Sequence, residues 1–283
     1  MLGDSERVTS AVAPERSVAG GRPRDPGGLG RLTRIAATGF MFALFGLGSL
    51  VTFGVVLPFR LTFVRRGVPR DLLAQRLVHQ SLRLFVRIGT ALGVWSVEAQ
   101  HTERLVLGPA LVVANHPTLL DAVLLLAHMP QADCIVKRAA WRNPFLRRVV
   151  SAAAYIPNDT AEDLVARCSE RLSAGRSVIL FPEGSRSPLE GMREFQRGAA
   201  HIALASGCCV VVALLYCDPP ALKKGQAWYA LPNERLRFRL EVDPPIRTLT
   251  EGVGTLPRSL AARRVTQKLR DHFDRRLRNG RAS

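Results

Sequence analysis

The chain of 283 residues is long enough for one substantial α/β domain with an additional segment, and too short for two full domains. Its formal net charge of +17 comes almost entirely from arginine, and it fits an anionic membrane surface or an acidic carrier protein as partner at least as well as nucleic acid. The low aromatic content of 6% offers no platform for stacking bases and the five cysteines lack metal-ligand spacing, so we expect no nucleic acid, no metal site and reduced thiols.

The N-terminal part of the sequence predicts a leader followed by a membrane segment. Residues 1–30 are rich in Gly, Pro, Arg and Ser, a composition typical of a disordered leader. No residue from Ile35 to Phe59 is charged. A helix of that length would extend roughly 37 Å, enough for a bilayer core of roughly 30 Å. We expect insertion into the membrane, with a buried core helix or a re-entrant hairpin as the alternatives.

A second helical pattern follows, with apolar residues every three or four positions from Leu73 to Trp95 and arginines on another face. It predicts either an amphipathic helix along the lipid headgroups or an ordinary core helix. Residues 31–95 are therefore the expected membrane-associated segment, and 96–283 the expected α/β domain. The denser arginines on the C-terminal flank of the apolar stretch favour a cytoplasmic position for that domain.

The first candidate for chemistry follows a short apolar run, Leu111–Ala114, which predicts a buried strand. Pro117 suits the first turn of a helix, so His116 would lie just before the helix and Asp121 in its first turn. From there Asp121 can orient the imidazole as a general base, an effect worth roughly a hundred- to ten-thousandfold in rate. The alternative is that His116 only hydrogen-bonds a turn while Asp121 favours the helix N-terminus.

The remaining pattern alternates strands with helices, which predicts an α/β fold with a mostly parallel central sheet flanked by helices. Sites in such sheets lie at the carboxyl ends of the strands. The strand predicted at Ser177–Phe181 runs directly into the polar segment Pro182–Ser187. The other predicted elements are strands at Cys134–Lys137, up to Pro157 and at Leu236–Val242, and helices at Ala161–Leu172 and Arg258–Arg278.

Two segments, Asn115–Asp121 and Phe181–Ser187, together resemble motifs of the phospholipid/glycerol acyltransferase family, which includes the bacterial 1-acylglycerol-3-phosphate acyltransferases. The first has the family's His and Asp separated by four residues and preceded by Asn. The second reads Phe-Pro-Glu-Gly-Ser-Arg-Ser, where the family has Phe-Pro-Glu-Gly-(Thr/Ser)-Arg-Ser. Phe195–Ala199 resembles the segment that follows, and the resemblance covers roughly residues 70–250.

The resemblance implies that His116 takes the proton from an acceptor hydroxyl as it attacks an acyl thioester, with Asp121 orienting His116. It also implies that Arg186 pairs with a phosphate and that Glu183 holds either Arg186 or a glycerol hydroxyl. Lys137 is a second candidate phosphate ligand, or else a solvated charge at a strand end. The expected substrate-binding residues are Lys137, Glu183, Gly184, Ser185 and Arg186. No cofactor is expected beyond acyl-CoA or acyl-carrier protein as co-substrate.

Two segments depart from the family pattern. Tyr155–Asp159 lacks the basic residue that often helps hold the acceptor phosphate, and Val210–Tyr216 lacks a proline. The first departure points away from lysophosphatidic acid and towards another lysolipid or hydroxylated lipid as acceptor.

The expected protein is a membrane-associated O-acyltransferase that acylates a lysophospholipid at the cytoplasmic side of a bacterial inner membrane, with membrane lipids as partners. The alternatives are an acyltransferase with a non-phosphate acceptor, a thioesterase, and a non-catalytic lipid-binding protein of the same fold.

Overall fold

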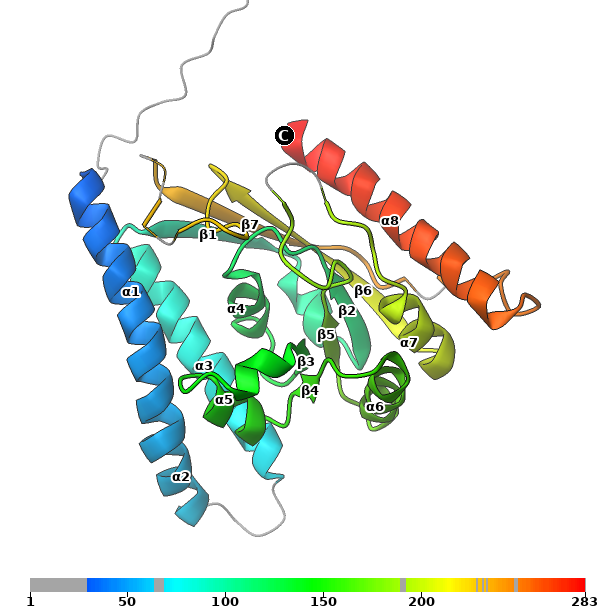
Figure 1. The fold of residues 1–283 in the computed structure, drawn as a ribbon, viewed down its shortest axis with the longest axis horizontal. Helices are drawn as coiled ribbons and strands as arrows, with labels where there is room; N and C mark the ends of the chain where they lie inside the picture. Colours follow the sequence, from blue (N-terminus) through cyan, green and yellow to red (C-terminus); the bar gives the residue numbers. More distant parts are fainter. Residues whose placement is uncertain are drawn as a thin grey trace, which may run out of the picture.

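The computed structural model describes residues 30–63, 69–188, 192–227, 229–230, 232, 234–246 and 249–282. Its centre is a seven-stranded sheet of order β1-β7-β6-β2-β5-β3-β4, with helices on both faces (Figure 1). The strands are β1 (Trp95–Gln100), β2 (Ala110–Ala114), β3 (Asp133–Val136), β4 (Ile156–Pro157), β5 (Val178–Leu180), β6 (Cys209–Asp218) and β7 (Leu236–Val242). The α/β prediction is confirmed.

The helices are α1 (Arg31–Val51), α2 (Leu57–Phe63), α3 (Arg70–Ala91), α4 (Asp121–Leu126), α5 (Arg147–Ala152), α6 (Ala161–Ser173), α7 (Gly198–Ser206) and α8 (Arg258–Ala282). Short helical turns cover Thr52–Val56, Thr102–Val106 and Arg138–Trp141. The first of these joins α1 to α2, so that residues 31–63 form one continuous helical rod. The predicted leader lies outside the described residues except for Gly30.

The central strand β2 explains why its sequence is continuously apolar. Successive side chains of a strand point to opposite faces, and both faces of β2 are covered by helices. Val112 and Ala114 join the core that includes α3 and α4, while Leu111 and Val113 join the core that includes α6, α7 and α8. A strand buried on both faces needs apolar residues at every position.

Strand β7 is the exception to the parallel arrangement. It pairs antiparallel with β6 and parallel with β1, whereas the pairs that β2 forms with β5 and β6 and that β3 forms with β4 and β5 are all parallel. As predicted, it covers Leu236–Val242 and alternates buried apolar residues with more exposed charged ones. The carboxyl ends of β2, β3, β5 and β6 consequently meet at one edge of the sheet.

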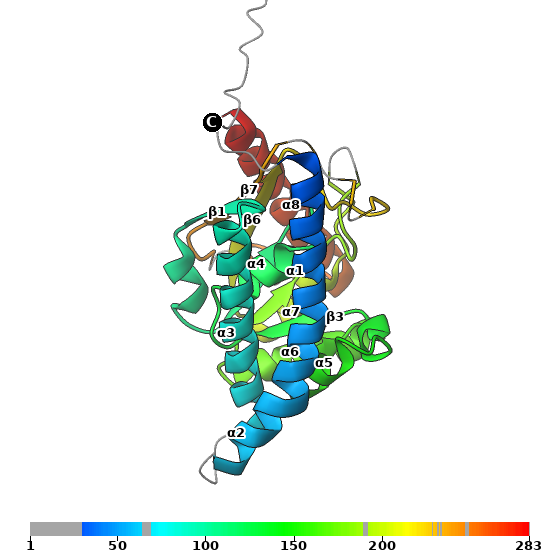
Figure 2. The ribbon, with the colours of Figure 1, turned by 90° about the vertical axis from the view of Figure 1, so that its left-hand side faces the viewer.

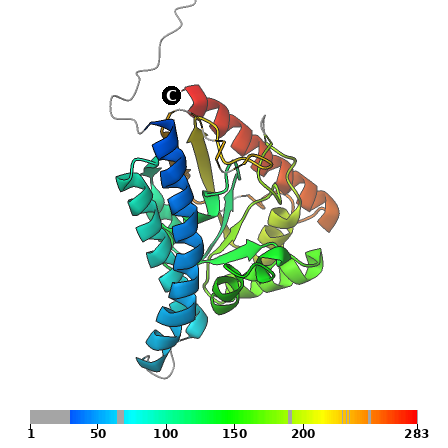
Figure 3. The same ribbon diagram turned by 60° about the vertical axis from the view of Figure 1, so that its left-hand side comes forward.

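The N-terminal rod lies along the domain, beside α3 (Figures 2 and 3). The ring of Phe45 contacts that of Phe85 at 5.6 Å between centroids, and the Ser49 hydroxyl donates to the Phe145 carbonyl at 2.7 Å. Among the described residues, Leu32–Phe63 is the one helix long and apolar enough to cross a membrane. Since it is one continuous helix, the re-entrant hairpin is excluded. Its outward side exposes Phe40, Leu47, Val51, Val55, Phe59 and Phe63.

Helix α3 packs between α1 and α4, as a core helix would. Its arginines Arg76, Arg83 and Arg87 are exposed as expected. The predicted C-terminal boundary is wrong, because Trp95 is the first residue of β1. Gly93, with φ +71°, follows the last helical turn and ends α3 in the way that a glycine in the left-handed region commonly does.

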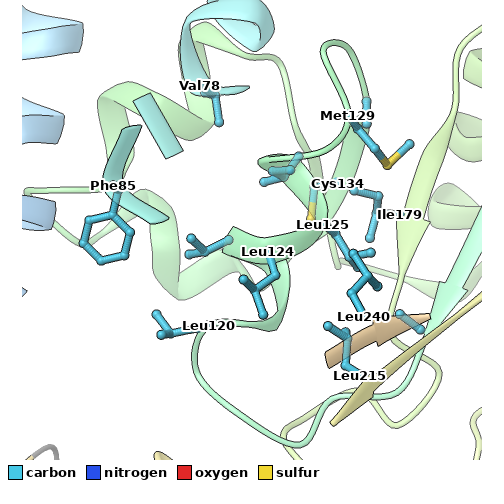
Figure 4. Close-up of a cluster of buried hydrophobic side chains, with 14 of the residues drawn as sticks. Val78, Phe85, Leu120, Leu124, Leu125, Met129, Cys134, Ile179, Leu215 and Leu240 are labelled. Atoms are coloured by element: carbon cyan, nitrogen blue, oxygen red, sulfur yellow. The ribbon is translucent and has the colours of Figure 1, made fainter. Parts of the chain in front are cut away.

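The short helix α4 is held in place by its apolar side chains. Leu124 and Leu125 are almost fully buried and lie between Val78 of α3 and the strand residue Leu240 (Figure 4). Each buried leucine contributes about 1.5–3 kcal/mol relative to an exposed one. This packing fixes the position of Asp121, the first residue of α4.

Candidate active site

The two polar segments meet because the strands that precede them are neighbours. β2 leads into Asn115 and His116, and β5, which pairs with β2 in parallel, leads into Phe181. The amide side chain of Asn115 continues the pairing of β2 with β6. Its Nδ2 donates to the Leu215 carbonyl and its Oδ1 accepts from the Leu215 N–H, both at 2.8 Å. This contact sets where the chain leaves the sheet, directly before His116.

The predicted contact between His116 and Asp121 is confirmed. Nδ1 of His116 lies 2.6 Å from Oδ2 of Asp121, and the carboxylate also accepts the N–H and the hydroxyl of Thr118, both at 2.6 Å. A carboxylate only accepts hydrogen bonds, so Nδ1 carries the hydrogen, and in the neutral imidazole Nε2 then has a free lone pair. Asp121 is fully buried. Burial raises the pKa of its carboxyl above the ordinary value, while the bonds from His116 and Thr118 oppose that rise.

The structure corrects the expected start of the helix. α4 begins at Asp121, so Pro117 lies before the helix and not in its first turn. The Thr118 hydroxyl donates to Asp121 and accepts from the Leu120 N–H at 3.2 Å. These local bonds hold residues 118–120 in a turn, since threonine and aspartate side chains compete with the helix for backbone partners.

The aromatic ring of Phe181 stacks on the imidazole of His116, a contact that the sequence did not predict. The ring centroids are 4.3 Å apart and the planes are inclined by 27°. An aromatic face in this position restricts rotation of the imidazole and stabilises a positive charge on it. The phenylalanine of the second motif therefore acts on the base of the first.

Glu183 has a different role from the expected one. Its buried carboxylate, 3% exposed, accepts the backbone N–H of His116 at 2.9 Å, the Ser187 hydroxyl at 2.7 Å and the Arg193 N–H at 3.1 Å. The Ser187 N–H also donates to the His116 carbonyl at 2.7 Å. The carboxylate is thus occupied by donors of the protein itself, and it holds the backbone of His116 rather than Arg186.

Arg186 is held by backbone carbonyls of a loop that follows β6. Its Nη1 donates to the carbonyls of Leu222 at 3.0 Å and Lys223 at 3.1 Å. Gly184 has φ +64°, and a Cβ there would lie 2.8 Å from the side chain of Gln196. The backbone conformation therefore favours glycine at this position, and a Cβ would in addition force the Gln196 amide to move.

A cleft of about 440 Å³ brings most of the predicted site residues together. It is lined by His116, Lys137, Gly184, Ser185 and Arg186, together with Asn158, Gln196 and Lys224 and a largely apolar remainder. Asp121 and Glu183 lie behind this surface. A larger cavity of about 990 Å³ lies next to this cleft. Its lining includes Pro117 and Thr118, which directly follow His116, and Ser187, which directly follows Arg186. Lys224 was not predicted, because no motif marks the loop that carries it.

A second histidine–carboxylate pair lies between α8 and the end of β7, away from the carboxyl ends of the parallel strands. Nε2 of His272 lies 2.6 Å from Oδ2 of Asp243, which also pairs with Arg276 at 2.8 Å. Burial alone would raise the pKa of Asp243, but the bonds from His272 and Arg276 hold it below the ordinary value. This cluster ties α8 to the sheet.

Residues 96–215, which contain both motifs, match the family model described as Acyltransferase. These residues are therefore similar to the acyltransferase-family domain. The resemblance drawn from the two motifs is thereby confirmed.

Two proteins with similar sequences are both named 1-acyl-sn-glycerol-3-phosphate acyltransferase. The chain is 32% identical over 108 residues to the chloroplastic 1-acyl-sn-glycerol-3-phosphate acyltransferase LPAT1 of Arabidopsis thaliana, covering 36% of this chain and 30% of that protein. It is 33% identical over 103 residues to the 1-acyl-sn-glycerol-3-phosphate acyltransferase of Helicobacter pylori, covering 34% of this chain and 44% of that protein. The matched part of the chain thus spans less than half the length of these relatives.

The fold is shared with a solved structure, the 1-acyl-sn-glycerophosphate (LPA) acyltransferase PlsC from Thermotoga maritima. The TM-score is 0.61 at 20% sequence identity, over 85% of this chain and 95% of that one. At this sequence identity the comparison shows a shared fold and nothing beyond it.

Proposed function

We propose that the protein is a membrane-associated O-acyltransferase that transfers a fatty acyl group from acyl-CoA or acyl-carrier protein to a hydroxyl of a lysophospholipid of the 1-acylglycerol 3-phosphate type. The observation that carries the proposal is a histidine with a free Nε2, oriented by a buried carboxylate, in one cleft with Arg186 and Lys137. The domain family and the names of the relatives support the same reaction class.

In the proposed reaction, the acceptor hydroxyl donates a hydrogen bond to Nε2 of His116. As its oxygen attacks the thioester carbonyl carbon, the proton passes to Nε2 and the imidazolium is stabilised by Asp121 and by the face of Phe181. The C–S bond of the tetrahedral intermediate then breaks, and the imidazolium returns the proton to the departing thiolate. The products are an ester and a free thiol, and His116 is restored.

The two cavities suggest how the substrates divide the site. We assign the acceptor headgroup to the cleft of about 440 Å³, because the base and the cations line it. Arginine and lysine bind phosphate through charge-assisted hydrogen bonds. Apolar lining residues such as Val136, Leu164 and Leu180 provide contacts for hydrocarbon. We assign the thioester end of the donor to the neighbouring cavity of about 990 Å³.

We also propose that the helical rod 31–63 lies in the plane of the membrane interface, with the catalytic domain on the cytoplasmic side of a bacterial inner membrane. One side of the rod packs against α3 and α5. A rod perpendicular to the membrane would carry the exposed arginines of α3 towards the hydrocarbon, where each charge costs several kcal/mol. In the plane, the exposed stripe Phe40 to Phe63 enters the bilayer while the arginines reach headgroups.

Product analysis by lipid mass spectrometry tests the reaction, using a panel of lysolipids with both donor types. The wild-type protein should form the acylated lipid, whereas free fatty acid alone would indicate a thioesterase, and neither product a binding protein. Replacing the base by His116→Ala should lower the rate roughly a hundred- to ten-thousandfold. Unchanged turnover in this variant, shown to be folded by its thermal unfolding, would refute the proposed base.

Labelling in sealed inner-membrane vesicles tests the orientation of the rod. Thr33→Cys and Thr62→Cys place thiols at exposed positions near its two ends. A rod in the plane gives labelling of both by a membrane-impermeant maleimide from the cytoplasmic side, above the background of the five native cysteines. Labelling from opposite sides would show a spanning helix.

A further inference from the structure

We propose that Lys224 is a specificity-determining residue that binds the phosphomonoester of the acceptor lipid. This inference rests on the proposed function and extends it to a residue outside both motifs. Lys224 lines the same cleft as His116, Lys137 and Arg186. The three cations come from different elements, since Lys137 follows β3, Arg186 follows β5 and Lys224 follows β6. They converge on the edge where the parallel strands end.

The charges around the cleft are unbalanced. Among its lining residues, all of which belong to the described part of the chain, there is no aspartate or glutamate. The ammonium groups of Lys137 and Lys224 form no ion pair or hydrogen bond with described residues, and Arg186 uses Nη1 on two neutral carbonyls. Three cations without a carboxylate attract a dianion more strongly than a monoanion or a neutral group. A phosphomonoester carries that charge and a phosphodiester does not.

The loop that carries Lys224 is fixed by hydrogen bonds. The Leu222 carbonyl accepts from the Leu119 N–H at 3.1 Å and from Arg186, and the Lys223 carbonyl accepts from Arg186 as well. The Lys223 N–H donates to Oε1 of Gln226 at 3.1 Å. Arg186 is therefore both a cation of the cleft and the support of the loop, so the position of Lys224 depends on Arg186.

This arrangement accounts for the departure in the segment Tyr155–Asp159. That segment offers no basic residue, and the residue it contributes to the cleft is the neutral Asn158. Lys224 supplies the additional cation from the loop after β6. The departure therefore no longer points away from a phosphorylated acceptor, as it did when the sequence was considered alone.

The donor also carries phosphates, and the covalent structures of the substrates separate the two sources. In a 1-acylglycerol 3-phosphate, the phosphate is attached to the carbon next to the one that bears the reacting hydroxyl. In acyl-CoA the whole pantetheine arm separates the thioester from the nearest phosphate. A cation that shares a cleft of about 440 Å³ with His116 is thus within reach of the acceptor phosphate.

Kinetics of Lys224→Ala with two acceptors test the proposal. KM for 1-oleoylglycerol 3-phosphate should rise about tenfold through loss of one partly solvated charge-assisted bond, with kcat within about twofold. KM for 1-oleoylglycerol, which lacks the phosphate, and KM for the donor should change less than about twofold, and Lys224→Arg should restore part of the loss. The matched control is Lys268→Ala on α8, whose Nζ is exposed and contacts the Glu251 carbonyl.

If Lys224→Ala raises KM for the donor more than KM for 1-oleoylglycerol 3-phosphate, Lys224 belongs to the donor site and the proposal is overturned. Equal changes in KM for the two acceptors, or no change in either, would also overturn it. A binding measurement keeps the test independent of turnover. Calorimetry with sn-glycerol 3-phosphate should show about tenfold weaker binding to the His116→Ala/Lys224→Ala variant than to His116→Ala. If the wild type acylates no lysolipid, the proposed function fails, and this comparison still decides whether Lys224 binds a phosphomonoester.

Discussion

Replacing Glu183 by glutamine separates a positioning role from a role in substrate binding. The carboxylate accepts three hydrogen bonds from the protein, two at Oε2 and one at Oε1 from the His116 N–H. A glutamine amide keeps one acceptor oxygen. If that oxygen takes the place of Oε2, the amide NH₂ faces the N–H of His116, and two donors oppose each other. One charge-assisted bond is lost and a buried donor is left unsatisfied, which costs about 2–3 kcal/mol.

The same change displaces His116 from its position against the acceptor, so kcat should fall up to about 100-fold while the acceptor KM stays within about threefold. Urea denaturation measures the stability loss and steady-state kinetics the two constants. The exposed neighbour Glu194→Gln is the matched control and should change neither. A Glu183→Gln variant with the stability of the wild type and a strongly raised acceptor KM would refute the positioning role.

Three further predictions concern the residues around the site and the clamp on α8. Gly184→Ala should cost more stability than Gly175→Ala. Both glycines have positive φ, which costs an alanine about 1–2 kcal/mol, but only at Gly184 would the Cβ also displace the Gln196 side chain. Denaturation of both variants measures the difference, and equal losses would contradict it. Phe181→Leu should lower kcat about two- to tenfold through loss of 0.5–1.5 kcal/mol of stacking, measured at saturating substrate. Asp243→Asn should destabilise the protein at neutral pH. The pKa of Asp243 is depressed in the folded state. The difference in unfolding free energy between wild type and variant should therefore be largest above pH 3.8, the ordinary pKa, and should disappear as the pH falls further. A gap that is constant with pH would show that the charge of Asp243 is not involved.

The parts that the sequence predicts well are those governed by local periodicity or short spacing. Strand β7 has its predicted bounds because its alternating charged and apolar residues match a strand with one buried face. α6 begins at Ala161 after Thr160, whose hydroxyl accepts the Asp163 N–H. The contact of His116 with Asp121 is predictable for the same reason, since only five positions separate the two residues.

The parts that the sequence does not predict depend on contacts between distant segments. Glu183 binds the backbone of a residue 67 positions away, and His272 binds Asp243 across 29 positions. No periodicity encodes such a pair, and a carboxylate in a motif has the same sequence signature whether it faces substrate or backbone. Lys224 is hidden for a further reason, because it lies in a loop whose shape is set by Arg186 and Leu119.

The electrostatic character of the cleft follows from where the two motif carboxylates point. Asp121 is directed at Thr118 and at Nδ1 of His116, and Glu183 at backbone and hydroxyl donors. Both carboxylates are taken up by donors of the protein and neither lines the cleft, so neither forms an ion pair with the cations there. Had either faced the cleft, its charge would have opposed a phosphate at close range and in a medium less polar than water. The same hydrogen bonds that orient the base therefore also leave the cleft positively charged, which joins catalysis and acceptor recognition in one network.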